Sequence, residues 1–474
     1  MSGKAAAADA GAAQRIFPLM RDTGRAIMLT RGNNTHSGNL ALRDAVDRDV
    51  FHITASGSQV GALIPSDVVP VRFSHVSWGD GRASTESTIH RKILAIPGAE
   101  ASIHAHYLSA ISVSFDSKEA QNFLLYEGDA QGVEEFSFVP IDRTGAWLLG
   151  KVPSGTYLEP VGSKEMEARI PRYLTDSRAT LVKGHGPFVR GGSLEECLHL
   201  LGVVDASAAL VQAARLRGVD TSAIARRIRE AGPAAFYPMP VRAFDAAAFG
   251  TYDTKDEATI RAFRERALFN FVQGVSPYGA GSMSEKITEH EMLYCPTASA
   301  PEGFEIAIRR LPLDADDGGD WELAFHKTLY RETNHKACII TQSPLASAEG
   351  LAVLAERYGM EALVRPESVA IDYADRIDHP VVKPIDAEAV YLNPRVGLCR
   401  WDAPVAAVLD MLRWHKGACF IAGVGAIGAG KVTLEQAAHH VSSGESIARF
   451  RQAVHLAHVL RGGAPISHYE PATQ

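Results

Sequence analysis

Apolar and polar residues alternate along this chain with two different periods. Between about residues 15 and 217, short runs of β-branched residues, typical of strands, alternate with amphipathic stretches of helical period. The same alternation returns between about residues 256 and 461. Strands and helices that alternate in this way predict a layered fold of the α/β or α+β class; we expect α/β, with helices on both faces of a sheet (α/β/α), in each of the two regions.

Three other segments lack this periodicity. Residues 218–255 contain several prolines and many alanines, which predict a connector with a short helix. Residues 462–474 predict a loose tail. The first fourteen residues are rich in alanine and hold no long apolar stretch, so they predict a frayed end rather than a signal peptide. The expected domains are therefore residues 15–217 and 256–461.

Four short motifs of the first region return in the same order in the second. They are separated by 243, 236, 236 and 239 residues. The pairs are 53–56 with 296–299, 86–94 with 322–330, 101–106 with 337–342, and 183–186 with 422–425. Conserved order with small changes in spacing indicates two tandem copies of one domain.

Composition excludes several classes of function. Forty-eight Lys and Arg against 55 Asp and Glu give a net charge of −7, so no nucleic-acid or anionic membrane partner is indicated. The five cysteines are widely spaced without a CxxC pair, as in a reducing compartment. No unbroken apolar run reaches the roughly 18–20 residues of a transmembrane helix. We expect a cytoplasmic protein.

Three histidines are candidates for a metal site. His104 and His106 lie in a strand-like run, where residues i and i+2 point to the same face. His185 follows a second strand-like run and lies between two glycines. Three neutral imidazoles with one open position form a typical catalytic zinc site. The alternative is two surface histidines on an edge strand and a third in a loop.

Small polar residues next to a predicted helix are candidates for an anion site. Glu86 opens this helix, and Ser84 or Thr85 can cap it. An acidic residue in a first helical turn is common for structural reasons alone. The turns around Asn39 and at residues 54–57 offer further hydroxyl and backbone N–H groups. Together these groups can hold a phosphate, with Glu86 near the metal as a ligand or a general acid/base.

The order of these motifs resembles the class II aldolase/adducin family, and within it the fuculose-phosphate aldolases. The resemblance covers most of residues 20–215. It rests on Ser37-Gly38-Asn39-Leu40, Thr54-Ala55-Ser56-Gly57, Ser84-Thr85-Glu86, His104-Ala105-His106 and Gly184-His185-Gly186. It implies a divalent metal, usually Zn²⁺ with Mn²⁺ or Co²⁺ as alternatives, bound by His104, His106 and His185. It also implies a catalytic Glu86 and a phosphate site made by Asn39, Ser56, Gly57, Ser84 and Thr85.

The resemblance further implies a lyase that breaks or forms a C–C bond next to a ketone, through an enediolate stabilised by the metal. The substrate would be small, anionic and phosphorylated. Tyr126 stands where such aldolases place a catalytic tyrosine that reaches across a subunit boundary, although its flanking residues match poorly. Family members are often tetramers, so a chain with two copies is expected to form a homodimer.

Other functions stay open at this stage. Similar family members act as decarboxylases, dehydratases or 4-epimerases, and groups around Tyr107, Tyr126 and Asp129 would distinguish them. Adducins are non-catalytic binding proteins, although the intact set of histidines with Glu86 argues against that role here.

The second copy lacks these metal ligands. Ile340, Gln342 and Val424 stand at the positions of the three histidines, and only Glu322 keeps its place. We therefore expect a structural second domain. Within it, residues 425–431 match the G-x₄-G-K phosphate-binding pattern, but Val432 stands where the Mg²⁺-binding Ser or Thr belongs. A glycine-rich packing turn is the better interpretation.

Overall fold

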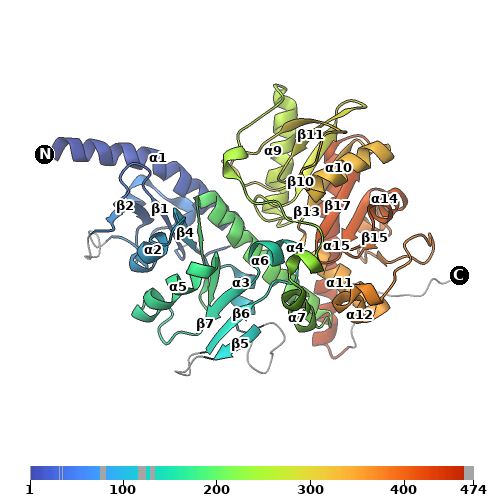
Figure 1. The fold of residues 1–474 in the computed structure, drawn as a ribbon, viewed down its shortest axis with the longest axis horizontal. Helices are drawn as coiled ribbons and strands as arrows, with labels where there is room; N and C mark the ends of the chain where they lie inside the picture. The colour runs from blue at the N-terminus through green and yellow to red at the C-terminus, as the bar shows by residue number, and fades with distance from the viewer. Residues whose placement is uncertain are drawn as a thin grey trace.

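The computed structural model describes residues 2–30, 32–34, 36–74, 82–115, 124–128 and 134–463, without the side chains of 2–14, 124–128 and 134–136. In Figure 1 the first half of the chain, blue to green, lies beside the second half, yellow to red. Each half is built around one mixed sheet.

The first sheet has nine strands in the order β3-β2-β1-β4-β9-β8-β7-β6-β5. All neighbours pair antiparallel except β7 and β8. In chain order the strands are β1 Asn39–Arg43, β2 Val50–Thr54, β3 Val68–Arg72, β4 Ala101–His104, β5 Leu124–Gly128, β6 Glu134–Phe138, β7 Val152–Gly155, β8 Ala179–Val182 and β9 Gly186–Gly191.

Helices cover both faces of this sheet. Phe188 packs with α2 and α5, whereas its neighbour Val189 packs with α6 on the other face. This alternation follows from the two-residue period of a strand. The helices of the first half are α1 Ser2–Leu29, α2 Ser87–Leu94, α3 Leu108–Val113, α4 Arg143–Leu148, α5 Lys164–Asp176 and α6 Leu194–Leu216. Because α1 begins at Ser2, the expectation of a frayed N-terminal end was wrong.

The second sheet repeats the strand order of the first up to its eighth strand. Its order is β12-β11-β10-β13-β17-β16-β15-β14, and the pair β15–β16 is parallel like β7–β8. Its strands are β10 Ser282–Lys286, β11 Glu291–Cys295, β12 Arg309–Pro312, β13 Ala337–Thr341, β14 Val381–Val382, β15 Val396–Cys399, β16 Ala418–Ile421 and β17 Gly425–Gly430. This order is consistent with two copies of one domain.

The strand register changes one of the expected correspondences between the two halves by two residues. Ala41 pairs with Ile53 in the first sheet, and Ser284 pairs with Tyr294 in the second. Asn39 and Ser282 occupy the same place in their sheets, opposite His104 and Ile340. Ile53 therefore corresponds to Tyr294 rather than to Pro296, because the β10–β11 hairpin is two residues shorter.

The connector is more ordered than its composition predicts. It forms α7 Thr221–Ala231 and α8 Pro233–Phe236, and Tyr237 is fully buried with its hydroxyl donated to the Ile141 carbonyl. The remaining helices are α9 Glu257–Val272, α10 Trp321–Glu332, α11 Pro344–Tyr358, α12 Glu361–Val364, α13 Ala387–Leu392, α14 Val405–Trp414 and α15 Leu434–Leu460.

The glycine-rich segment that resembles a nucleotide-binding loop is the buried strand β17. A Cβ on Gly428 would lie 2.2 Å from the Ala437 carbonyl oxygen, and one on Gly430 would lie 2.4 Å from that of Thr433. Both carbonyls belong to α15 or its N-cap. The glycines therefore allow α15 to pack against the strand, which agrees with a packing role, although the segment is a strand and not a turn.

The two halves share one continuous hydrophobic core, which runs through the contact between α6 and α11. By length and composition α6 is apolar enough to cross a membrane, but 78% of its most apolar window is buried inside the structure. A buried ionic cluster adds to this contact. Glu349 of α11 is fully buried, 2.7 Å from Arg451 Nε and 3.8 Å from Arg217 Nε at the end of α6.

Replacing Glu349 by Ala should destabilise the protein strongly, because the buried guanidinium of Arg451 would lose its carboxylate partner. We expect a loss of about 3–5 kcal/mol in the free energy of unfolding. Urea denaturation followed by circular dichroism measures it. The matched control is Asp410→Ala, which breaks the exposed Asp410–Arg413 pair and should cost no more than about 1 kcal/mol. Equal effects of the two substitutions would contradict the importance of this cluster.

Candidate metal centre and active site

The three predicted histidines meet at one end of the first sheet. His104 ends β4, His106 follows two residues later, and His185 lies in the turn between β8 and β9. Strand β4 pairs with β9, so this turn reaches the end of β4. His104 Nε2 lies 3.0 Å from His106 Nε2 and 3.1 Å from His185 Nε2. One ligand atom from each ring therefore converges on a common point.

Backbone contacts orient these rings toward that point. The Nδ1 atom of His104 donates to the Pro187 carbonyl at 3.0 Å, which leaves the lone pair of Nε2 facing the other two rings. Phe188 stacks on His104 with ring centroids 4.1 Å apart. The backbone N–H of His106 donates to Asn33 Oδ1 at 2.7 Å and so holds the segment after β4.

The donor set fits a divalent metal ion. Burial lowers the pKa of His104 and His106 and lowers that of His185 to about 3, so all three rings are neutral. Neutral imidazole is the form that binds zinc, with Zn–N distances of about 2.0–2.1 Å. Nitrogen atoms 3.0–3.1 Å apart need only small movements to surround such an ion.

Glu86 stands beside the three rings. Its Oε2 atom lies 3.9 Å from His104 Nε2 and accepts a hydrogen bond from Asn39 Nδ2 at 2.8 Å. Its Oε1 atom is buried and has no hydrogen-bond partner among the described residues. Burial raises the pKa of Glu86, against the opposing effect of His185 and Asn39. Glu86 thus combines a fixed oxygen with one that can accept a proton.

A buried hydrogen-bond chain positions Glu86. His90 of α2 donates through Nε2 to Asn39 Oδ1, and Asn39 in turn donates to Glu86. Burial lowers the pKa of His90 to about 3, so its ring stays neutral. The place of His90 in this hydrogen-bond chain is that of an orienting residue. Asn39, expected at the phosphate, keeps one amide N–H for a ligand.

The other predicted anion-binding residues lie on two adjacent segments. Ala55 and Ala83 form an isolated bridge, which places residues 54–57 alongside 82–86. Ser56, Gly57 and Thr85 are exposed, whereas Ser84 is buried and its Oγ accepts from the Glu86 N–H at 3.3 Å. Glu86 itself is the N-cap of α2, so the positive end of this helix adjoins both segments.

Of the tyrosines considered for the reaction, Tyr107 has a described side chain and Tyr126 does not. Tyr126 lies on β5, opposite Phe136 of β6, and its side chain lies outside the described residues. Asp129 lies outside them altogether. Tyr107 is buried with its hydroxyl 2.9 Å from Thr30 Oγ1, which gives it a packing role.

The second half places an arginine where the first half has its histidines. Glu322, the counterpart of Glu86, accepts from Arg143 Nη2 at 2.6 Å, and Arg242 lies 3.5 Å away. Burial opposes ionisation of Glu322, but the attraction of Arg143 and Arg242 lowers its pKa. His326 stands 2.9 Å from Ser282 Oγ, as His90 stands next to Asn39. Neither arginine was predicted from the sequence, because their contacts join distant segments of the chain.

Comparisons with known proteins agree with this arrangement. A model of the class II aldolase and adducin N-terminal domain matches residues 19–211. A methylthioribulose-1-phosphate dehydratase of Microcystis aeruginosa is 30% identical over 182 residues, which are 36% of this chain and 81% of that protein. One from Leptospira biflexa is 26% identical over 174 residues, 34% of this chain and 78% of that protein.

The fuculose-1-phosphate aldolase structure of Thermus thermophilus is 26% identical, covering 43% of this chain and 95% of that chain with a TM-score of 0.37. The family match spans the part of the chain that holds the histidine cluster, Glu86 and the two small-residue segments. The chain therefore belongs to the class II aldolase and adducin family, as one of its enzymes.

Proposed function

We propose that this protein is a metal-dependent lyase that acts next to the carbonyl group of a small phosphorylated ketose. The observation that carries the proposal is the convergence of three neutral imidazoles, whose ligand atoms all lie within 4.8 Å of one another, beside the buried carboxyl group of Glu86. A divalent ion held by His104, His106 and His185 would supply a Lewis acid that polarises the carbonyl.

Glu86 is the group that moves a proton. Its free Oε1 takes the proton from the carbon next to the carbonyl, while Asn39 holds Oε2 in place. The raised pKa of Glu86 favours this exchange, because a base with a pKa nearer neutrality also returns the proton readily. His90 keeps Asn39 oriented for this role.

The segments 54–57 and 82–86 are proposed to bind the phosphate group. Hydroxyl and backbone N–H groups of Ser56, Gly57, Ser84 and Thr85 are presented beside the positive end of α2. The amide group of Asn39 links this region to Glu86. A phosphate bound there would place the carbonyl end of a short ketose near the histidines.

Two reactions need a proton moved at this carbon, in opposite directions. In retro-aldol cleavage, which was expected first from the sequence, the hydroxyl on the following carbon loses its proton and becomes an aldehyde oxygen, the bond between the two carbons breaks, and the carbon next to the carbonyl gains a proton, which Glu86 can give. In dehydration, the proton leaves the carbon next to the carbonyl and the hydroxyl on the following carbon leaves as water, with a double bond formed between the two carbons. The names of the two curated relatives favour dehydration, so we place it first.

A panel of ketose 1-phosphates tests the reaction. We expect one member to lose water, giving a dicarbonyl that mass spectrometry detects 18 mass units lower, with no release of a triose phosphate. The variant Glu86→Gln should lower kcat by about 10²–10⁴-fold while keeping the metal, because it removes proton transfer alone. If triose phosphate is the product, the reaction is retro-aldol cleavage and not dehydration. Unchanged turnover in Glu86→Gln would refute the role of Glu86.

Metal content tests the site independently of activity. Plasma emission spectroscopy should find one equivalent per chain, zinc being the expected ion and manganese or cobalt the alternatives. His106→Ala should lose this equivalent. Its matched control is Gln342→Ala at the corresponding position of the second half, which should keep it. A full equivalent retained in His106→Ala, or a second equivalent in the native protein, would contradict a single site in the first half.

We also propose that the two halves are copies of one domain and that the chain forms a homodimer. Within the chain, α4 docks on the site of the second half: the Arg143 N–H donates to the Gly423 carbonyl at 2.7 Å, and Gln342 Nε2 donates to Asp142 at 2.9 Å. The counterpart of α4 is α13, capped by Asp386 as α4 is capped by Asp142. Its Tyr391 is 83% exposed. Docking of α13 on the catalytic half of a second chain would complete a ring of four domains.

Sedimentation velocity checks this arrangement. The native protein should sediment as a dimer, and Tyr391→Glu should sediment as a monomer because a carboxylate would enter the contact. The control is Val432→Glu, an equally drastic change at a residue that is 73% exposed on a loop of the second half, and it should leave the dimer intact. A native protein that is monomeric and fully active would rule the dimer out.

A further inference from the structure

A cavity of about 580 Å³ lies where the two halves and the connector meet. Its walls come from α4, the connector around Arg242, the β10–β11 hairpin and the beginning of α10. The ion pair of Arg143 and Glu322 forms part of its lining, at the counterpart of the catalytic site. Its volume is within the usual range for a small-molecule site.

Arg143 brings an incompletely satisfied cation to this cavity. The residue is only 3% exposed, and one nitrogen of its guanidinium donates to Glu322 at 2.6 Å. Its Nε and Nη1 atoms have no acceptor among the described residues. A buried guanidinium is costly unless acceptors satisfy its N–H groups. A ligand with an acidic group could supply the acceptors that the Arg143–Glu322 pair lacks.

The innermost charges around the cavity form two ion pairs. Arg242 donates to Asp320 at 2.6 Å and to Tyr294 Oη at 2.7 Å, and its side chain is 30% exposed. Arg143 and Arg242 are thus balanced by Glu322 and Asp320, while Arg309 adds a third positive charge on the wall. Three exposed or half-exposed aspartates also lie at the rim, so three arginines face five carboxylates, and an anionic ligand would be held by direct contact with the guanidinium groups rather than by the net charge of the walls.

A phosphate site is not repeated in this half. By strand register the proposed phosphate-binding turn corresponds to residues 295–298, which are buried, and the hydroxyl groups of Thr297 and of the adjacent Ser299 are bonded within the protein. Thr297 Oγ1 donates to the Ser299 carbonyl at 2.9 Å, and Ser299 Oγ donates to the Ser276 carbonyl at 2.7 Å. The walls also carry apolar residues, among them Phe244 and Phe249, which form an edge-to-face pair.

We propose that this cavity binds a small monocarboxylic acid with an apolar body, its carboxylate meeting Arg143 and Arg242 and its body lying against Phe244 and Phe249. The ligand would bridge the two halves and the connector. This site is separate from the metal centre and does not depend on the reaction proposed for it.

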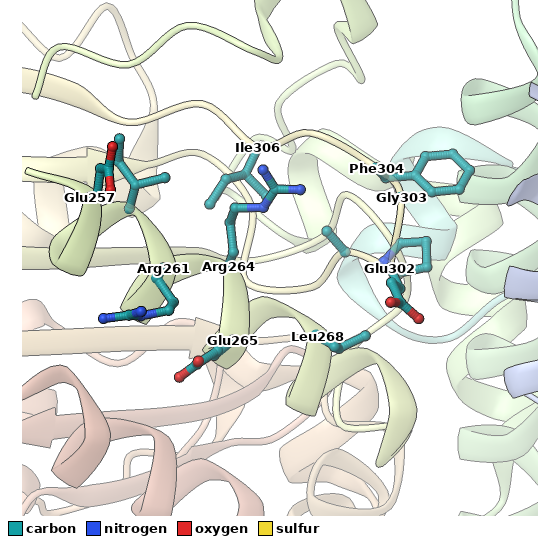
Figure 2. A pocket seen from close by; sticks show the side chains of 12 residues that line it. Glu257, Arg261, Arg264, Glu265, Leu268, Glu302, Gly303, Phe304 and Ile306 are labelled. Carbon is teal, nitrogen blue, oxygen red and sulfur yellow. The ribbon is translucent and has the colours of Figure 1, made fainter. Parts of the chain in front are cut away.

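A second hollow in the same half lacks these features. Figure 2 shows it between α9 and residues 300–306, with a volume of about 380 Å³. The charged side chains that line it, among them Arg261, Arg264 and Glu265, are all exposed. It presents no buried charge without a partner among the described residues, so it carries no comparable inference.

Calorimetric titration of the full-length protein with 4-methylpentanoate and with benzoate tests the proposal. Both acids should bind saturably at one site per chain, with a dissociation constant on the order of a millimolar or tighter. The fluorescence of Trp321 should change with the same affinity, because this ring lies 5.4 Å from the Arg143 guanidinium carbon. Trp321→Phe should abolish that signal, which locates the binding at this cavity rather than at the histidines.

The double variant Arg143→Met with Glu322→Met removes the buried pair as a unit, which spares the fold an unpaired charge. It should weaken binding by about tenfold or more. The control Asp410→Met with Arg413→Met removes an exposed pair and should bind normally. The proposal fails if neither acid binds, if 4-methylpentanol or inorganic phosphate binds as tightly, or if the Arg143–Glu322 variant binds as the native protein does.

Discussion

A carboxyl group buried at the start of a helix needs positive charge nearby, and both halves of this molecule meet that requirement. In the first half Glu86 faces three imidazoles that can hold a metal cation. In the second half Glu322 faces the guanidinium of Arg143, which comes from the other half. One electrostatic constraint thus produces a metal centre in one place and a contact between halves in the other.

The arrangement around each glutamate follows from its sheet. Asn39 and Ser282 open equivalent strands and stand between the glutamate and a neutral histidine of the next helix, His90 or His326. The hydrogen-bond chain is therefore retained in the second half although the imidazoles that would hold a metal are not. Retention of these contacts indicates that they also serve the packing of α2 and α10 on their sheets.

Local patterns were enough to predict that three histidines of the first half lie together and that each half combines strands with helices. The spacing of His104 and His106 and the glycines around His185 report on strand and turn geometry, which depends on a few neighbouring residues. The similarity of residues 53–56 to 296–299 led to a pairing that is two residues out of register. The β10–β11 hairpin is two residues shorter than the β1–β2 hairpin, and this difference is visible only in the pairing of the strands. Arg143 was missed for a different reason: its partner Glu322 is 179 residues away, and no periodicity along the chain reports such a contact.

The Arg143–Glu322 pair also affects whether a metal site could be restored in the second half by substitution. On the proposed duplication, the ancestral second domain lost three ligands, now Ile340, Gln342 and Val424. Restoring histidines there would not restore a metal centre, because a fixed organic cation already neutralises Glu322 and Gln342 is bonded to Asp142. The pair therefore makes the change hard to reverse. Once the Arg143 guanidinium neutralised Glu322, each half depended on the other for the stability of this contact.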